Sequence, residues 1–108
     1  MAPADPSESI RLPGRRVFDN RGQRVGRVAD VVYDRVSSLP RWAVVDMGRV
    51  MRHRTAVPLR EAHRSADGDL VVPFGRAEVR HAPRHGGGPV LTGGEERELR
   101  RYYRLDGA

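Results

Sequence analysis

The sequence predicts a small antiparallel β-barrel followed by a short C-terminal helix. Five short apolar segments follow one another at hairpin-like spacing and are separated by turns rich in Gly, Asp and Ser, which is typical of a compact all-β domain. Gly26 stands inside the longest of these segments, where a glycine usually marks the bulge or curl that closes a small sheet. The length of 108 residues fits one domain.

The first predicted strand ends at Val17 and Phe18. Residues 19–22 (Asp-Asn-Arg-Gly) then form a hairpin turn, because Asn and Gly tolerate positive φ. The second predicted strand covers residues 25–33 and carries apolar side chains on both faces from Val28 onward.

Residues 37–40 turn the chain into a third strand at residues 42–47, which Gly48 ends. A fourth strand is expected at residues 55–59, and its Pro58 indicates an edge position or a bulge, because proline cannot donate to the ladder. The turn at residues 66–69 leads into a fifth strand at residues 70–74.

The segments outside the strands complete the predicted organisation. Residues 1–9 are expected to be a disordered lead-in, residues 10–82 the barrel, and residues 83–91 a flexible Gly/Pro linker. Thr92 and Glu95 have the spacing of a capping box, which begins an amphipathic helix at residues 92–104. One face of this helix carries an apolar stripe, which is expected to dock either on its own barrel or on that of a second copy: Leu99, Tyr102 and Tyr103.

Composition excludes several functional classes. The chain has no cysteine, which excludes a disulfide scaffold, a thiolate zinc site and a cysteine nucleophile. Its apolar runs are far shorter than the roughly 20 residues that span a bilayer, and its N-terminus does not resemble a signal peptide. We therefore expect a cytoplasmic protein without membrane insertion.

The positive charge is concentrated in the predicted barrel. The net charge is +6, and residues 10–82 contain 15 Arg against 8 acidic residues. Such an excess favours an acidic protein, a nucleic acid or an anionic surface as partner. The basic residues are all arginine, which GC-rich coding also produces, so part of the charge can serve solubility alone.

No set of residues indicates catalysis, a metal or a cofactor. His81 and His85 have the i, i+4 spacing of two metal ligands on a helix, but Pro83 between them would break that helix. We expect them, like His53 and His63, to be surface side chains. Without lysine there is no Walker-type phosphate loop. We therefore predict that the chain is not an enzyme.

The loop after the third strand is the strongest candidate for a binding site. Two apolar side chains stand there among basic ones, in the stretch Arg49, Val50, Met51, Arg52, His53 and Arg54. An apolar tip surrounded by Arg is a plausible contact point for a partner protein. The alternative is that Val50 and Met51 fold back and close one end of the barrel.

The motifs together resemble a PRC-barrel domain. The resemblance rests on four stretches: residues 12–34 (LPGRRVFDNRGQRVGRVADVVYD), 42–48 (WAVVDMG), 56–59 (AVPL) and 71–74 (VVPF). This family includes barrels of the photosynthetic reaction centre H subunit and of the ribosome maturation factor RimM, and stand-alone bacterial members. The resemblance implies a six-stranded barrel that binds other proteins, with no catalytic residues.

Three expectations about function follow. The first is a non-catalytic adaptor that binds a still unidentified, acidic protein through loop 49–54. The alternative is a ribosome- or RNA-associated factor that binds through the Arg-rich barrel, although aromatic stacking platforms are sparse at 6% aromatic residues. We also expect a homodimer, because a thin core and an open strand edge both favour pairing with a second copy.

Overall fold

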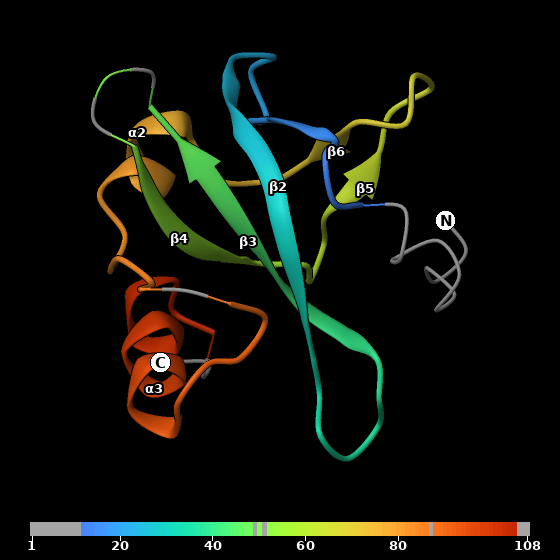
Figure 1. The fold of residues 1–108 in the computed structure, drawn as a ribbon. Coiled ribbons are helices and arrows are strands. Elements are labelled where there is room, and N and C mark those ends of the chain that lie inside the picture. The colour runs from blue at the N-terminus through green and yellow to red at the C-terminus, as the bar shows by residue number, and fades with distance from the viewer. Residues whose placement is uncertain (1–11, 49, 51, 87, 106–108) are drawn as a thin grey trace.

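The computed structural model describes residues 12–48, 50, 52–86 and 88–105 of the chain. This part of the chain contains six strands and two helices (Figure 1). Their bounds are β1 Arg16–Phe18, β2 Arg24–Tyr33, β3 Pro40–Met47, β4 His53–Pro58, β5 His63–Arg64, β6 Leu70–Val71, α2 Arg76–Arg80 and α3 Gly93–Tyr102. The predicted lead-in at residues 1–9 lies outside the described residues.

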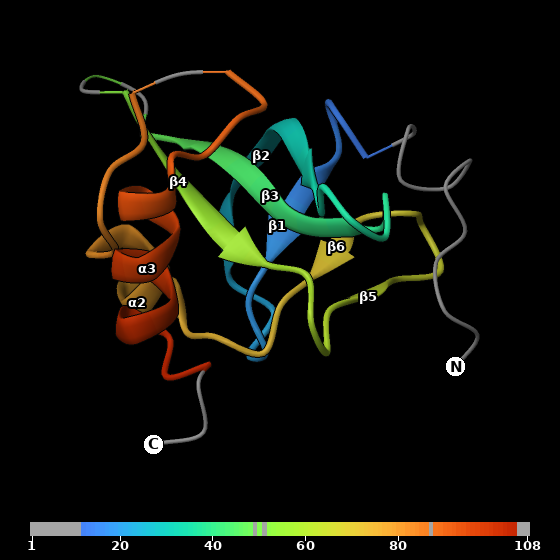
Figure 2. The same ribbon diagram turned by 90° about the horizontal axis from the view of Figure 1, so that it is seen from below.

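The strands form one mixed sheet in the order β4-β3-β2-β1-β6-β5. Neighbouring strands are antiparallel except β1 and β6, which run parallel with Val17 opposite Leu70. β4 and β5 stand at the two ends of this order, so hydrogen bonds do not close the sheet among the described residues. The prediction of a purely antiparallel barrel is wrong because β1 and β6 run parallel. An open strand edge is present as expected, and the sheet curls around a core (Figure 2).

The parallel pair arises from the hairpin that β5 and β6 form. His63 lies opposite Val71 and Arg64 opposite Leu70, and this short hairpin places β6 against the free edge of β1. The predicted strand at residues 70–74 stops at Val71. Val72 still donates from its backbone N to the oxygen of Phe18 (3.0 Å), but Pro73 has no N–H with which to continue the ladder.

Gly26 lies at the point where β2 curls, as predicted. The register between β1 and β2 shifts between Val17 and Phe18, opposite Gly26 and Arg24. A Cβ atom at Gly26 would collide with the backbone oxygen of Asp46 on β3. Only glycine therefore allows β2 to approach β3 this closely, next to the bulge between β1 and β2.

The turn between β1 and β2 is held by a buried carboxylate. Asp19 is 2% exposed, and its Oδ1 accepts hydrogen bonds from the backbone N of Arg21 and of Gln23, both at 2.8 Å. Its Oδ2 accepts from the backbone N of Arg76 (3.0 Å) at the start of α2. Burial by itself raises the pKa of Asp19, but these three N–H donors outweigh it and hold the pKa below its ordinary value. One side chain thus fixes both the hairpin turn and the position of α2.

The sheet buries apolar side chains on both faces, because β3 carries them at consecutive positions. On its inner face, Ala43, Val45 and Met47 join a core that also contains Val17, Val28, Val57, Leu70, Val72 and Val79. On the outer face, Trp42 and Val44 join a second core with Ala56, Ala82, Leu91, Leu99 and Tyr103. The second core exists because α3 covers that part of the sheet.

Helix α3 begins with the predicted capping box. The backbone N of Glu95 donates to Thr92 Oγ1 (3.1 Å), and Glu95 Oε1 accepts from the backbone N of Thr92 (2.9 Å). The helix ends at Tyr102, two residues earlier than predicted. Neither helix in the described part of the chain has the length and apolar character needed to cross a membrane.

Candidate functional site

The predicted loop site is only partly within the described residues. Arg49 and Met51 lie outside them. Val50 is 94% exposed, so the alternative that Val50 folds back to close the barrel is wrong. Arg52 is exposed, whereas His53 and Arg54 are half-buried and form the first two positions of β4. The loop therefore presents an apolar side chain to solvent immediately before a basic strand end.

Strand register places two arginines on the outer face beside this loop. Arg27 on β2 lies opposite Asp46 on β3, and Asp46 lies opposite Arg54 on β4. Directly opposed residues in antiparallel strands point to the same face, so the three form a row across the sheet. Val45 and Thr55, one position along, are fully buried and point to the opposite face. Because Asp46 alternates along β3 with Trp42 and Val44 of the second core, the row lies on the outer face.

Residues 83–85 run along the free edge of β4 and add a further arginine. Thr55 Oγ1 donates to the oxygen of Pro83 (2.7 Å), and the backbone N of His85 donates to the oxygen of Arg54 (2.8 Å). Thr55 and Arg84 form an isolated antiparallel bridge. Pro58 thus lies on an edge strand, as predicted, and part of that edge is covered by the chain itself.

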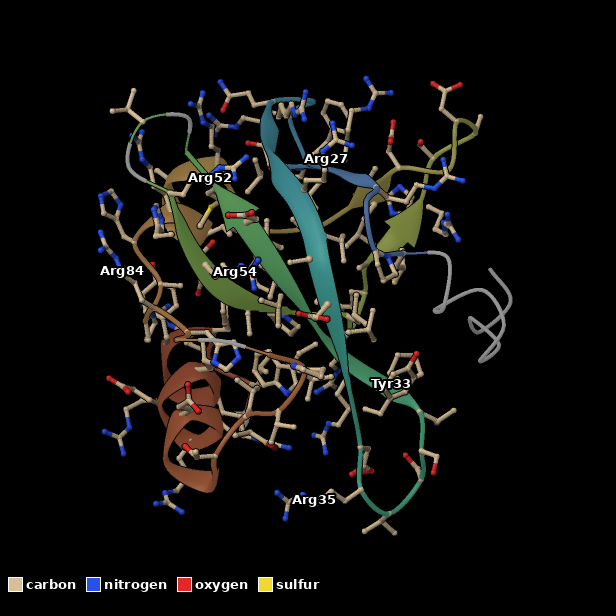
Figure 3. All side chains as sticks on the ribbon, viewed as in Figure 1. Arg27, Tyr33, Arg35, Arg52, Arg54 and Arg84 are labelled. Carbon is tan, nitrogen blue, oxygen red and sulfur yellow. The ribbon has the colours of Figure 1, made fainter. Side chains whose placement is uncertain are left out.

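We call the resulting surface the basic face: Arg27, Arg52 and Arg54, with Arg84 on the adjoining edge of β4 and Val50 at its margin. Figure 3 shows these four arginines in the upper half of the view, away from the β2–β3 hairpin that carries Tyr33 and Arg35. A shallow hollow of about 330 Å³ lies within it, lined by Asp46, Arg52, His53, Arg54, His85 and Gly86.

Most of the positive charge on the basic face is not neutralised. Arg27 donates from Nη1 to the backbone oxygen of Gly14 (2.6 Å). Arg52, Arg54 and Arg84 form no ion pair with any described residue. A guanidinium presents five N–H donors in a planar fork that matches a carboxylate or a phosphate. This surface is therefore chemically suited to an anionic partner.

His85 is not the exposed linker histidine that the sequence indicates. It is 6% exposed; its Nδ1 lies 2.7 Å from Glu95 Oε2 and its Nε2 lies 2.9 Å from the oxygen of Gly88. The backbone N–H of Thr92, followed by the side chain of His85, lowers the pKa of Glu95, so the carboxylate is ionised at neutral pH. Both nitrogens of His85 therefore lie within hydrogen-bond distance of an oxygen atom. These contacts connect His85 and Gly88, which precede α3, to the capping box of the helix.

The apolar stripe of α3 docks on its own sheet. Leu99 is 2% exposed and Tyr103 is 5% exposed, both within the outer core around Trp42. Tyr102 is half-buried, and its hydroxyl donates to the backbone oxygen of Glu78 in α2 (2.6 Å). Because this stripe is buried within the chain, it does not provide the interface of the predicted homodimer, which stays a prediction.

The β2–β3 hairpin carries exposed apolar residues that were not predicted as a candidate site. Tyr33 is 40% exposed, Val36 93% and Leu39 52%. The available signal was the placement of Leu39 within the predicted turn and of Val36 directly before it, where polar residues are usual. It could not be interpreted without knowing that the hairpin projects beyond the sheet (Figure 1).

No group of three or more His, Cys, Asp or Glu side chains suited to a metal ion occurs among the described residues. His63 is exposed, as predicted. His53 is half-buried, and its buried Nε2 has no hydrogen-bond partner in the described part of the chain, so the expectation of a surface histidine is wrong there.

Comparison with known proteins identifies the fold. No curated protein matches the chain. A family model for the PRC-barrel domain matches residues 11–80, a range that contains β1 to β6 and α2 and leaves out α3. The resemblance in the sequence motifs is thereby confirmed, and the chain belongs to the PRC-barrel domain family.

Proposed function

We propose that this chain is a non-catalytic adaptor module of the bacterial cytoplasm that binds a partner protein through the basic face. The observation that carries the proposal is the juxtaposition of Val50, 94% exposed, with arginines that have no ion-pair partner among the described residues. An apolar anchor with surrounding charge is the usual composition of a protein-binding surface.

The charge of the basic face indicates an acidic partner surface. Arg52 and Arg54 line the same hollow as a single half-buried acid, Asp46. Electrostatic complementarity with Asp or Glu side chains would speed association and orient the partner. Because the strand ends and residues 83–85 hold these arginines, little backbone ordering is needed on binding, which favours affinity.

The adaptor proposal predicts that charge reversal on the basic face removes a specific set of bound proteins. We expect Val50→Asp, and separately the double variant Arg52→Glu, Arg54→Glu, to lose the same proteins from quantitative co-purification in the native cell, each by at least tenfold. In the double variant the reversed charges would repel an acidic partner, since like charges across an interface are unfavourable. In Val50→Asp a negative charge replaces the apolar anchor.

The matched control for this experiment reverses arginines elsewhere. Arg60 and Arg101 are exposed and lie outside the basic face, so Arg60→Glu, Arg101→Glu changes the net charge equally. We expect this control to retain the bound proteins. Equal co-purification from all variants, or equal loss from the control, would contradict the assignment of the site.

Association with RNA is the second candidate, because an unneutralised row of arginines also suits phosphate groups. The basic face contributes no exposed aromatic side chain for base stacking; Tyr33, 40% exposed, lies at the other end of the molecule (Figure 3). We expect ribosomal RNA to bind only at low salt, with an affinity that falls steeply as salt rises. Binding that persists near physiological salt and is lost with Arg52→Glu, Arg54→Glu would favour the RNA function over the adaptor.

A further inference from the structure

The β2–β3 hairpin and the opposite part of the sheet carry complementary surfaces. We define the hairpin knob as Tyr33, Arg35, Val36 and Leu39. Three of the five exposed large apolar side chains of the described residues belong to it; the other two are Val50 and Val90. Figure 1 shows the hairpin as the part of the sheet that projects furthest from the body. Such a concentration of apolar groups marks an interaction surface more often than scattered exposure does.

The knob is rigid because the turn is organised around Asp34. Its Oδ2 accepts from Ser37 Oγ (2.9 Å), its backbone N donates to the oxygen of Leu39 (2.7 Å), and its backbone O accepts from the N of Ser38 (2.9 Å). Arg41 forms an ion pair with Asp34 at 3.6 Å. The hydroxyl of Ser37, with its backbone N–H, lowers the pKa of Asp34. The apolar side chains are thus presented without a large ordering cost on binding.

The complementary surface is a groove over the outer face of β1, β6 and β5. It has a volume of about 720 Å³. We define the acidic groove by its apolar floor, Phe18, Val71 and Pro73, and its acidic residues, Glu61, Asp67 and Asp69. Arg16 stacks over the ring of Phe18 at 5.4 Å and binds Asp69 through Nη2 (2.9 Å).

Negative charge remains in the groove after this pairing. Glu61 and Asp67 are exposed and form no ion pair with any described residue. In a chain with a net charge of +6, an acidic groove with an apolar floor is the exception. It is suited to an apolar segment that carries a positive charge, and the knob has this composition through Val36, Leu39 and Arg35.

We propose that the hairpin knob of one copy inserts into the acidic groove of a second copy, and that this contact is the self-association interface. Val36 is 93% exposed, so the knob does not occupy the groove of its own chain. Insertion brings Arg35 toward Glu61 and Asp67 and removes apolar side chains from water on both partners. One knob buries less than the roughly 800 Å² per partner of a standard interface, so the association is weak and two reciprocal contacts strengthen it.

The test is sedimentation velocity of the full chain over a concentration series that reaches a few hundred micromolar. We expect the wild type to self-associate, and both Val36→Asp, Leu39→Asp (the knob variant) and Glu61→Arg, Asp67→Arg (the groove variant) to associate at least tenfold more weakly. Because the substituted side chains are exposed, we expect the melting temperature of both variants to equal that of the wild type. This measurement verifies that the variants are folded.

A mixture of the two variants separates a direct contact from an indirect effect. The knob variant retains its groove and the groove variant retains its knob, so an equimolar mixture is expected to associate more strongly than either variant alone. Val90→Asp, at a residue 61% exposed on the segment before α3, is the matched control and is expected to associate like the wild type.

Three results would overturn the proposal. They are a wild type that stays monomeric over the whole series, a knob variant that associates like the wild type, and a mixture no stronger than its components. The basic-face variant Arg52→Glu, Arg54→Glu is expected to self-associate normally. Because this variant changes only the basic face, its self-association tests the knob and groove interface independently of the adaptor proposal.

Discussion

Replacing Leu99 by alanine is expected to lower the free energy of unfolding by about 2–5 kcal/mol, the range for truncating a buried leucine. Leu99 is 2% exposed and belongs to the outer core, in which α3 packs against Trp42 and Val44. The substitution removes apolar contacts at the centre of this packing and leaves a cavity that the rigid strands cannot fill. Urea denaturation followed by circular dichroism measures the loss.

Leu39→Ala is the matched control for this prediction. Leu39 is 52% exposed on the hairpin, so the same chemical change there is expected to alter the free energy of unfolding by less than about 0.5 kcal/mol. Limited proteolysis should cut the Leu99 variant after residue 92 more readily than the wild type, because α3 would be bound less firmly to the sheet. Equal destabilisation by both substitutions would show that α3 does not dock as described.

Replacing Asp19 by alanine is expected to cost about 3 kcal/mol or more, because three backbone N–H groups lose a charged acceptor at once. The bonds to Arg21 and Gln23 hold the β1–β2 turn, and the bond to Arg76 holds the start of α2. Asp19→Asn keeps one acceptor oxygen but places an NH₂ donor against an N–H, so an intermediate loss is expected. Chemical denaturation at neutral pH measures both.

The contribution of Asp19 also depends on pH. Its pKa in the folded chain lies below the ordinary value of 3.8, so the folded state binds a proton less readily than the unfolded state. The stabilisation is therefore complete above the unfolded pKa and is lost as pH falls from that value through the folded pKa. We expect the difference in stability between the wild type and Asp19→Ala to shrink when the measurement is repeated at about pH 3.

Asp67→Ala is the control for the pH experiment. Asp67 is an exposed acid in the turn before β6, and its removal is expected to change stability little at either pH. A difference between wild type and Asp19→Ala that does not shrink in acid would mean that the charge of Asp19 contributes nothing beyond its hydrogen-bonding geometry.

Features that depend on neighbours along the chain could be predicted from the sequence. The turn at residues 19–22, the curl at Gly26, the edge position of Pro58 and the capping box of Thr92 are all confirmed. Each follows from the chemistry of a few adjacent residues: a glycine that tolerates positive φ at position 22, an absent side chain, an absent N–H, and a hydroxyl at a helix start. The hydrogen bonds that the Asp19 carboxylate accepts in the turn were found only in the structure.

The candidate surfaces were predicted less completely. The loop before β4 was identified from Val50 and its basic neighbours, but Arg27 and Arg84 joined the basic face only through strand pairing and the edge contact with residues 83–85. The hairpin knob and the acidic groove were not identified at all. Exposure of Val36 and the assembly of Phe18 with Val71 depend on which segments cover which face, and sequence spacing does not specify this.

The family, the order and approximate extent of the longer strands, and the helix with its cap could all be predicted from the residues alone. Three features emerged only from the folded chain: β6 runs parallel to β1, His85 is buried against Glu95, and α3 docks on its own chain. All three are contacts between segments that are not adjacent in the sequence. Their free energy depends on competition among alternative partners for the same apolar faces and strand edges, and local residue preferences do not decide that competition.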